Sequence, residues 1–262
     1  MTRKKFLKLC SSVGLGFFFS PLVNAKENPM SIVKKIPKEN MYTSRLGWLE
    51  SRFHFSFADY SDSENMNFGA LRVLNDDIIH PKGGFPTHPH KDMEIVSYIV
   101  KGEITHQDSM GNAECLKRGE VQYMSAGTGI QHSEFNMHES EDLRLLQIWI
   151  LPPKYGVTPI YGSHFYKEAE RKDKLLKIVS SQKGEAKVKI HQDVNIYVSE
   201  LTKHKTLKYS INQNRQIYFV QIEGSSLVNG EKLTHGDALT LIEDTALKIT
   251  ALSESHFLFI EV

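Results

Sequence analysis

Thr87-His88-Pro89-His90 and Gln131-His132-Ser133-Glu134 bound the part of the sequence that decides the fold, within residues 83–136. Both segments lie in strand-like sequence, and residues two apart on an extended strand point to the same side. The two histidines of the first segment therefore share one face of their strand, as His132 and Glu134 do on theirs. If these strands pair across a small barrel, all four side chains point to one interior position. Three imidazoles and one carboxylate suit Fe, Mn, Ni, Cu or Zn and leave coordination positions open for a substrate.

Strand-like runs separated by turn residues surround these two segments. The strongest run is Glu94–Val100, which is followed by a turn at Lys101-Gly102-Glu103. Another is Arg144–Leu151, which ends at Pro152-Pro153. Short strands with turns every eight to twelve residues or so indicate an all-β sandwich or barrel.

The second half of the chain repeats the pattern of the first. When Gly102 is aligned with Gly224, the run Glu94–Gly102 falls on Gln216–Gly224. This duplication predicts two barrel domains in one chain. At the four positions that align with the predicted metal ligands, the second copy has Ser210, Asn212, Ile249 and Ala251. None of them is a good transition-metal ligand, so the metal is expected only in the first barrel. We place the N-terminal, metal-binding domain at residues 41–160 and the C-terminal domain, without metal ligands, at residues 178–262.

Residues 1–25 are typical of an export signal peptide. A basic segment, Thr2–Lys8, precedes a mostly apolar one, and Val23-Asn24-Ala25 offers a signal-peptidase site. The basic segment resembles a twin-arginine signal in which Lys4 replaces the second arginine. We predict export to the periplasm, and a cytoplasmic protein is the alternative if the true start is Met30. The polar residues 27–40 are interpreted as a loose leader.

Composition excludes several classes of partner. The chain has 262 residues with 32 basic and 31 acidic side chains, and removal of residues 1–25 changes the net charge to −3. Such a balance gives no attraction to nucleic acid or anionic lipid. No segment after residue 25 is long and apolar enough to cross a bilayer. Cys10 and Cys115 define no disulfide framework. We expect no nucleic-acid partner, no membrane association once the signal is removed, and a monomer.

Three longer motifs carry a family resemblance. They are Thr87-His88-Pro89-His90-Lys91-Asp92-Met93-Glu94, His106-Gln107-Asp108-Ser109-Met110-Gly111 and Met124-Ser125-Ala126-Gly127-Thr128-Gly129-Ile130-Gln131-His132-Ser133-Glu134. From about residue 41 to its end, the chain resembles the pirin family, and within it the bacterial pirin-like quercetin 2,3-dioxygenases. The resemblance implies a bicupin, with two jelly-roll β-barrels and metal only in the N-terminal one. It also implies that the metal ligands are His88, His90, His132 and Glu134, the same four that strand alternation selects.

The resemblance implies a metal-dependent dioxygenase that opens the heterocycle of a flavonol such as quercetin with O2 and releases CO. The expected cofactor is one divalent transition metal, iron first, with Cu, Mn, Ni, Co or Zn as alternatives. The expected partners are a small aromatic polyphenol and O2. Glu134 is the expected catalytic base. Glu94 is the alternative base, because alternation also places it on the His90 side. His106 could lie either at the barrel mouth or on the surface.

Two other functions are compatible with the same ligands, because one barrel fold supports different reactions. A non-enzymatic, redox-responsive metalloprotein would act through a protein partner, although export and the negative net charge argue against that role. An isomerase or another enzyme of this fold would use the metal as a Lewis acid without O2. Oxygen uptake distinguishes these functions from the dioxygenase.

Overall fold

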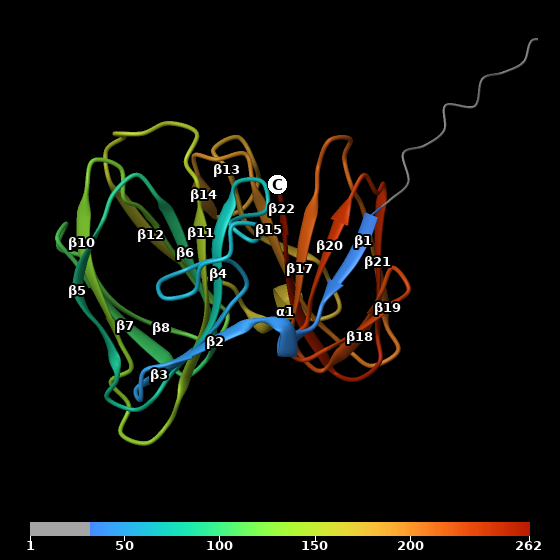
Figure 1. Cartoon of the computed structure of the whole chain (residues 1–262), viewed down its shortest axis with the longest axis horizontal. Coiled ribbons are helices and arrows are strands. Elements are labelled where there is room, and N and C mark those ends of the chain that lie inside the picture. The colour runs from blue at the N-terminus through green and yellow to red at the C-terminus, as the bar shows by residue number, and fades with distance from the viewer. Residues whose placement is uncertain (1–31) are drawn as a thin grey trace, which may run out of the picture.

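The computed structural model describes residues 32–262, so the predicted export signal (residues 1–25) and Met30 lie outside the described residues. Within that range the regular secondary structure is strand, apart from one 3-10 turn, η1 (Lys38–Asn40), and one short helix, α1 (Glu168–Arg171). The strands form two domains that lie side by side (Figure 1). The predicted all-β fold with two barrel domains is confirmed. No helix among residues 32–262 has the length and hydropathy needed to cross a membrane.

The N-terminal domain consists of two antiparallel sheets. In spatial order its larger sheet contains β12 (Ile160–Phe165), β9 (Glu120–Ser125), β6 (Glu94–Lys101), β11 (Leu143–Ile150), β4 (Leu71–Ile79), β3 (Leu49–Phe53) and β2 (Tyr42–Arg45). Its smaller sheet contains β5 (Gly84–His90), β10 (Ile130–Phe135), β7 (Glu103–Asp108) and β8 (Ala113–Lys117). The smaller sheet carries both histidine segments, and β5 forms one of its edges.

Strand β6 shows why one stretch of this sequence is apolar at successive positions. Ile95 and Ile99 pack into apolar clusters inside the N-terminal barrel. Val96 and Tyr98 point the opposite way, into a core that both domains share. A strand that is buried on both faces needs apolar residues at successive positions, which explains the continuous apolar run between Glu94 and Val100.

The C-terminal domain repeats the same two-sheet plan. Its larger sheet contains β1 (Ile32–Ile36), β20 (Ala238–Ile242), β17 (Ile217–Glu223), β22 (Ser255–Glu261), β15 (Asn195–Leu201), β13 (Leu176–Ser181) and β14 (Val188–Ile190). Its smaller sheet contains β16 (Thr206–Ser210), β21 (Ala246–Ala251), β18 (Ser225–Val228) and β19 (Glu231–Thr234).

Strand β1 comes from the start of the described chain but belongs to the C-terminal domain. It pairs with β20, with Ile32 opposite Ile242, and Figure 1 shows it in blue beside the orange and red strands. The prediction of a loose leader over residues 27–40 is therefore wrong for β1. A five-residue edge strand is too short for its alternation to show in the sequence, and only its partner in the other domain defines it.

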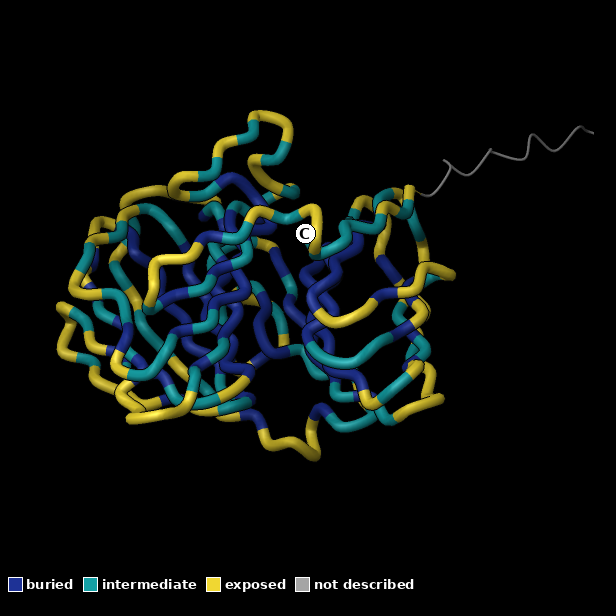
Figure 2. The backbone as a smooth tube through the Cα atoms, turned by 60° about the horizontal axis from the view of Figure 1, so that its bottom comes forward, coloured by how far each residue is buried: buried dark blue, intermediate teal, exposed yellow. Residues whose placement is uncertain are grey.

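The two larger sheets face each other across a shared hydrophobic core. Its buried side chains include Val96, Tyr98, Leu146 and Ile148 from the N-terminal domain and Val198, Tyr218, Val220 and Leu258 from the C-terminal domain. Figure 2 shows the buried segments running through the middle of the molecule. Full burial of one such aliphatic side chain contributes about 1.5–3 kcal/mol relative to exposure. The two domains are therefore held together by this shared hydrophobic core as well as by the polypeptide that connects them.

Strand pairing corrects the predicted ligand equivalents in the C-terminal barrel. Ile249 on β21 lies opposite Leu207 on β16, just as His132 lies opposite His88 in the N-terminal barrel. The predicted equivalents Ser210 and Asn212 are exposed, so this part of the alignment is wrong. The second copy is shorter than the first, and the sequence alone did not show where the difference falls. The corresponding interior positions hold apolar side chains.

Candidate metal centre

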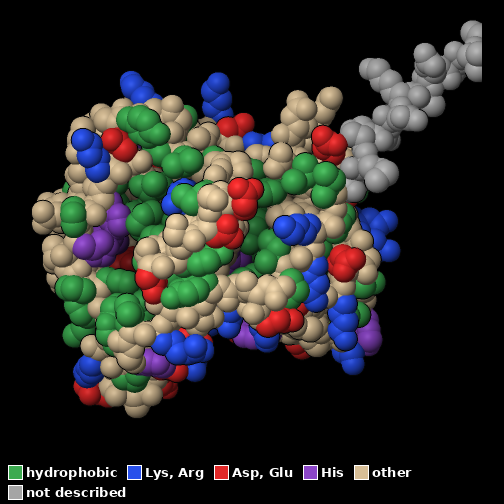
Figure 3. Space-filling model, in the orientation of Figure 1, with side chains coloured by type: hydrophobic (Ala, Val, Ile, Leu, Met, Phe, Trp, Pro, Cys, Tyr) green, Lys and Arg blue, Asp and Glu red, His purple; other side chains and the backbone are tan. Residues whose placement is uncertain are grey.

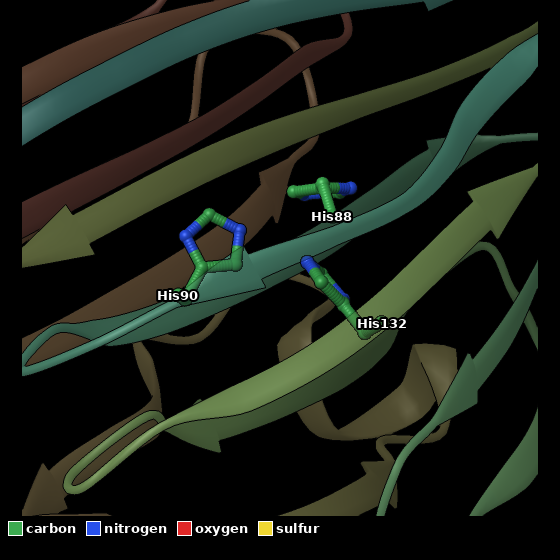
Figure 4. A group of neighbouring side chains, drawn as sticks. All are labelled: His88, His90 and His132. Atoms are coloured by element: carbon green, nitrogen blue, oxygen red, sulfur yellow. The ribbon is translucent and has the colours of Figure 1, made fainter.

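Three histidines meet on the inner face of the smaller sheet of the N-terminal domain (Figure 4). His88 and His90 come from β5, and His132 comes from the neighbouring β10. The ring centroid of His132 lies 4.5 Å from that of His88 and 4.9 Å from that of His90. One ring nitrogen of each residue lies within 4.8 Å of those of the other two. His88 and His90 are only partly buried, so the group is open to solvent on one side. Figure 3 shows histidine side chains at the surface of the N-terminal domain.

The hydrogen bonds of these rings fit a metal centre. Nδ1 of His88 donates to the carbonyl of Pro86 at 2.8 Å, which leaves the lone pair on Nε2 free for a metal. His132 is buried, and neither of its ring nitrogens has a hydrogen-bond partner. A buried polar atom without a partner costs about 1–3 kcal/mol, so these nitrogens are explained if a metal ion binds there.

Burial also sets the charge of the rings. Burial, together with a smaller effect of neighbouring histidines, lowers the pKa of His90 to about 4 and that of His132 to about 3. Both imidazoles are therefore neutral near pH 7, and neutral imidazole is the form that binds metal ions.

Glu134 lies two residues after His132 on β10 and is almost completely buried. Its carboxylate accepts hydrogen bonds from Nε2 of Gln147 at 2.9 Å and from Nε2 of Gln122 at 3.0 Å. Oγ of Ser97 is a more distant donor at 3.5 Å. Burial raises the pKa of Glu134 to about 7, although these donors favour its charged form. The glutamines thus hold the carboxylate in a fixed position.

The structure does not bring Glu134 into one group with all three predicted histidine ligands. Its carboxylate groups with His132 and His106 instead. Along β10, Glu134 lies beyond His132 on the side away from His90: His132 is opposite His88 and Glu134 is opposite Phe85, with an irregular pairing between these positions. Pro86 falls within this irregularity, and proline in a sheet is confined to edges and bulges.

The sequence allows His106 at either the barrel mouth or the surface, and the structure places it inside the barrel. It lies on β7 opposite Glu134 and is fully buried. Its ring stacks on that of Tyr161, with 4.6 Å between the ring centroids. The alternation of Ile104, His106 and Asp108 along β7 is the signal that could have placed it on the inner face.

Glu94 lies away from the histidine group, at the contact between the domains. It is fully buried. Its Oε1 accepts from the hydroxyl of Tyr123 at 2.8 Å, the backbone N–H of His191 at 2.6 Å and Nδ1 of His191 at 3.1 Å. Its Oε2 accepts from the backbone N–H of Gln192 at 2.8 Å. The carboxylate thus binds a loop of the C-terminal domain.

The prediction that Glu94 faces the His90 side is therefore wrong. Alternation holds only within one strand, and β5 ends at His90 before β6 begins at Glu94. The turn between them includes Asp92 with a φ of +50° and takes the chain from the smaller sheet to the larger one. On β6, Glu94 shares its face with Val96 and Tyr98, which pack in the core between the domains.

Asp77 is a further buried carboxyl in this domain and gives a prediction on stability. Burial raises its pKa from about 3.8 to about 7, and the charges of Asp76 and Glu134 add to this effect, whereas a hydrogen bond from Ser51 opposes it. The folded state therefore holds the Asp77 proton more tightly than the unfolded state. This stabilisation is complete below about pH 4 and is lost as the pH rises through about 7.

Asp77→Asn removes that titration, since the amide stays neutral. In metal-free protein, the stability of the variant relative to the unaltered chain is expected to rise by up to about 4 kcal/mol between about pH 4 and about pH 8. Urea unfolding of both proteins at the two pH values measures this difference. An equal pH dependence of the two proteins would show that folding does not raise the pKa of Asp77.

Both domains match known families. Residues 35–150 match the family described as Pirin, and residues 177–262 match the quercetinase C-terminal cupin domain. A quercetin 2,3-dioxygenase of Escherichia coli K12 is 42% identical over 216 residues, which are 82% of this chain and 92% of that protein. A pirin-like protein of Caulobacter vibrioides is 38% identical over 231 residues, 88% of this chain and 99% of its own length.

A solved structure agrees with these relatives. The bacterial pirin YhhW of Escherichia coli in complex with nickel(II) has a TM-score of 0.83 and 38% identity, and the match covers 88% of this chain and 99% of that one. Nearly the whole described chain is thus similar to proteins of one kind, in sequence and in fold. The chain belongs to the pirin family.

Proposed function

We propose that the protein is a metal-dependent oxidoreductase that opens the heterocycle of a flavonol such as quercetin with O2 and releases CO. The observation that carries this proposal is the convergence of ring nitrogens from His88, His90 and His132, two of which are only partly buried. The names of the relatives support the reaction class, since one of them is a quercetin 2,3-dioxygenase.

The three histidines would hold one divalent transition metal. We propose iron first, and nickel is an alternative because a related pirin binds nickel(II). When bound, the ion supplies Lewis-acid polarisation of a substrate oxygen. Because His88 and His90 are only partly buried, the ion would keep a side that a substrate can reach.

The surroundings of His90 suit a flat aromatic substrate. The Trp149 ring lies edge-on to His90, with 4.9 Å between the ring centroids. The ring centroids of Phe57 and Trp149 are 5.3 Å apart. Both aromatic side chains are partly exposed. Aromatic rings gain about 0.5–1.5 kcal/mol from such packing beyond their buried area.

Glu134 is the proposed acceptor of the proton that the flavonol 3-hydroxyl group loses. A carboxyl with a pKa of about 7 exchanges a proton readily near neutral pH, which is the condition for an effective general base. Gln122 and Gln147 fix its position, so it acts from a defined site in the barrel.

The test is oxygen uptake by the mature chain loaded with Fe(II), Ni(II) or Mn(II), with quercetin as substrate. We expect quercetin loss, O2 consumption and CO release in equal amounts. Glu134→Gln is expected to lower kcat by about 10²–10⁴-fold, the usual contribution of a general base, with metal content measured alongside. If none of the loaded proteins consumes quercetin or a related polyphenol under O2, the proposal fails.

We also propose that the protein is exported, on the basis of the basic and apolar segments within residues 1–25. Cell fractionation followed by N-terminal sequencing tests this. A periplasmic chain that begins near Lys26 is the expected result, and a cytoplasmic chain that begins at Met1 or Met30 would contradict it.

A further inference from the structure

A continuous line of aromatic rings joins the histidine group to the surface of the N-terminal domain. The line begins at His90, whose ring centroid lies 4.9 Å from that of Trp149, and Trp149 lies 5.3 Å from Phe57 on the same measure. The centroids of Phe57 and Phe53 are 5.3 Å apart, and those of Phe53 and Tyr42 are 5.8 Å apart. Each ring therefore neighbours the next, and Tyr42, which is 38% exposed, lies at the surface.

Strand pairing builds the outer part of this line. Tyr42 on β2 lies directly opposite Phe53 on β3, so their side chains share one face of the larger sheet. After β3 the chain turns back, and Phe57 and Tyr60 exchange two backbone hydrogen bonds. The ring of Tyr60 stacks on that of Tyr42, with 5.0 Å between the centroids and 7° between the planes. The line thus ends in a stacked pair of tyrosines.

The tyrosine pair has the surroundings of a one-electron donor. A phenol gives up an electron most easily when a neighbouring base takes its proton in the same step. The hydroxyl group of Tyr42 donates a hydrogen bond to Oδ2 of Asp59 at 2.8 Å, so this carboxylate is in place to take the proton. Tyrosine and tryptophan are the aromatic side chains that are oxidised most easily. The line has Trp149 beside the histidines and the tyrosine pair at its outer end.

We propose that this line carries single electrons from Tyr42 and Tyr60 to the metal centre when a peroxide reacts there without an organic substrate. Direct transfer over the whole distance would be slow, and the intervening rings divide it into short steps. The transfer removes oxidising equivalents that would otherwise attack the side chains around the metal. This inference rests on the metal position of the proposed function, because the line starts at His90, and it does not depend on flavonol cleavage.

Hydrogen peroxide takes up two electrons and two protons and becomes two molecules of water. One electron comes from bound Fe(II), which is oxidised to Fe(III), and the other comes from the phenol of Tyr42. The phenol proton passes to Asp59 and from there to solvent, which supplies the two protons for water. Tyr42 is left as a neutral radical. Because Tyr42 is exposed, a small one-electron reductant such as ascorbate or a thiol can reach it and restore the phenol, whose proton returns from solvent.

Freeze-quench EPR spectroscopy of the Fe(II)-loaded chain tests the proposal. Anaerobic mixing with hydrogen peroxide, without quercetin, is expected to give a tyrosyl radical signal that narrows in protein made with ring-deuterated tyrosine. Tyr42→Phe/Tyr60→Phe keeps both rings and removes both phenols, so this double variant should bind as much Fe(II) as the parent and lose the signal. Asp59→Asn should delay the appearance of the signal, because an amide does not take the phenol proton.

Tyr161 is the rival source of a radical and provides the matched control. Its ring stacks on that of His106, which in turn neighbours His132, and its hydroxyl group donates a hydrogen bond to Glu114 at 3.1 Å. Tyr161→Phe leaves the line from His90 to Tyr42 intact. This variant should therefore give the same radical signal as the parent.

The proposal is overturned if the double variant keeps the full signal, or if the Fe(II)-loaded parent consumes peroxide without forming a tyrosyl radical. A signal that is lost in Tyr161→Phe and kept in the double variant would also refute it. A radical that forms in a protein unable to turn over quercetin would support the electron path and contradict the proposed function alone. A parent that binds no Fe(II) at the three histidines would contradict both.

Discussion

Replacement of His132 by alanine is expected to cause the largest loss of metal affinity of any single substitution in the N-terminal barrel. His132 belongs to both groups of candidate ligand atoms, so its replacement removes a ligand whichever atoms hold the metal. Because loss of a partner that only orients a ligand costs about 10–100-fold, loss of this ligand should raise the dissociation constant for Co(II) at least about 1000-fold. Elemental analysis and calorimetric titration measure the effect.

The fold should tolerate this substitution. Removal of the ring leaves a cavity, which is destabilising, but it also removes two buried nitrogens that have no hydrogen-bond partners in the metal-free protein. These opposing terms are each of the order of 1–3 kcal/mol, so the metal-free variant should unfold close to where the parent does. His164→Ala, on β12 of the same domain, is the matched control, and this variant should bind as much metal as the parent protein. Stoichiometric metal in His132→Ala would refute the metal centre as a whole.

The parts of the fold that depend on local sequence were predictable. Strand alternation placed His88 with His90, and turn residues such as Lys101-Gly102-Glu103 separated β6 from β7. These features need only a few neighbouring residues. The convergence of His132 on the first pair required one further assumption, that β5 and β10 are neighbours, and the structure shows this pairing.

The features that the sequence did not reveal depend on how distant segments pair. The pairing of β10 with β7 places Glu134 opposite His106, and its carboxylate groups with His106 and His132. At Asp92 the chain turns and passes from the smaller sheet to the larger one. This places Glu94 at the contact between the domains. A shift of one residue in register or face exchanges the two sides of a strand, so small local irregularities change which residues meet.

Glu94→Ala is expected to be the most destabilising of the substitutions considered, at about 3–5 kcal/mol, without loss of metal. The change removes the acceptor for four hydrogen-bond donors from Tyr123, His191 and Gln192. Breaking a buried, hydrogen-bonded charge by removing one partner typically costs this much, because the remaining donors are left unsatisfied away from water. Urea unfolding of the metal-free variant and the parent measures the difference.

Glu94→Gln is the matched variant that separates this structural role from the predicted catalytic one. Its side-chain oxygen can still accept from Tyr123 and His191, and only the N–H of Gln192 then faces an amide donor. Its loss of stability should therefore be smaller, about 1–3 kcal/mol, which is the cost of one unsatisfied buried group. Because Glu94 does not reach the histidine group, folded Glu94→Gln should keep the parent's metal content and its kcat. A fall in kcat of about 100-fold or more with unchanged stability would instead identify Glu94 as the base.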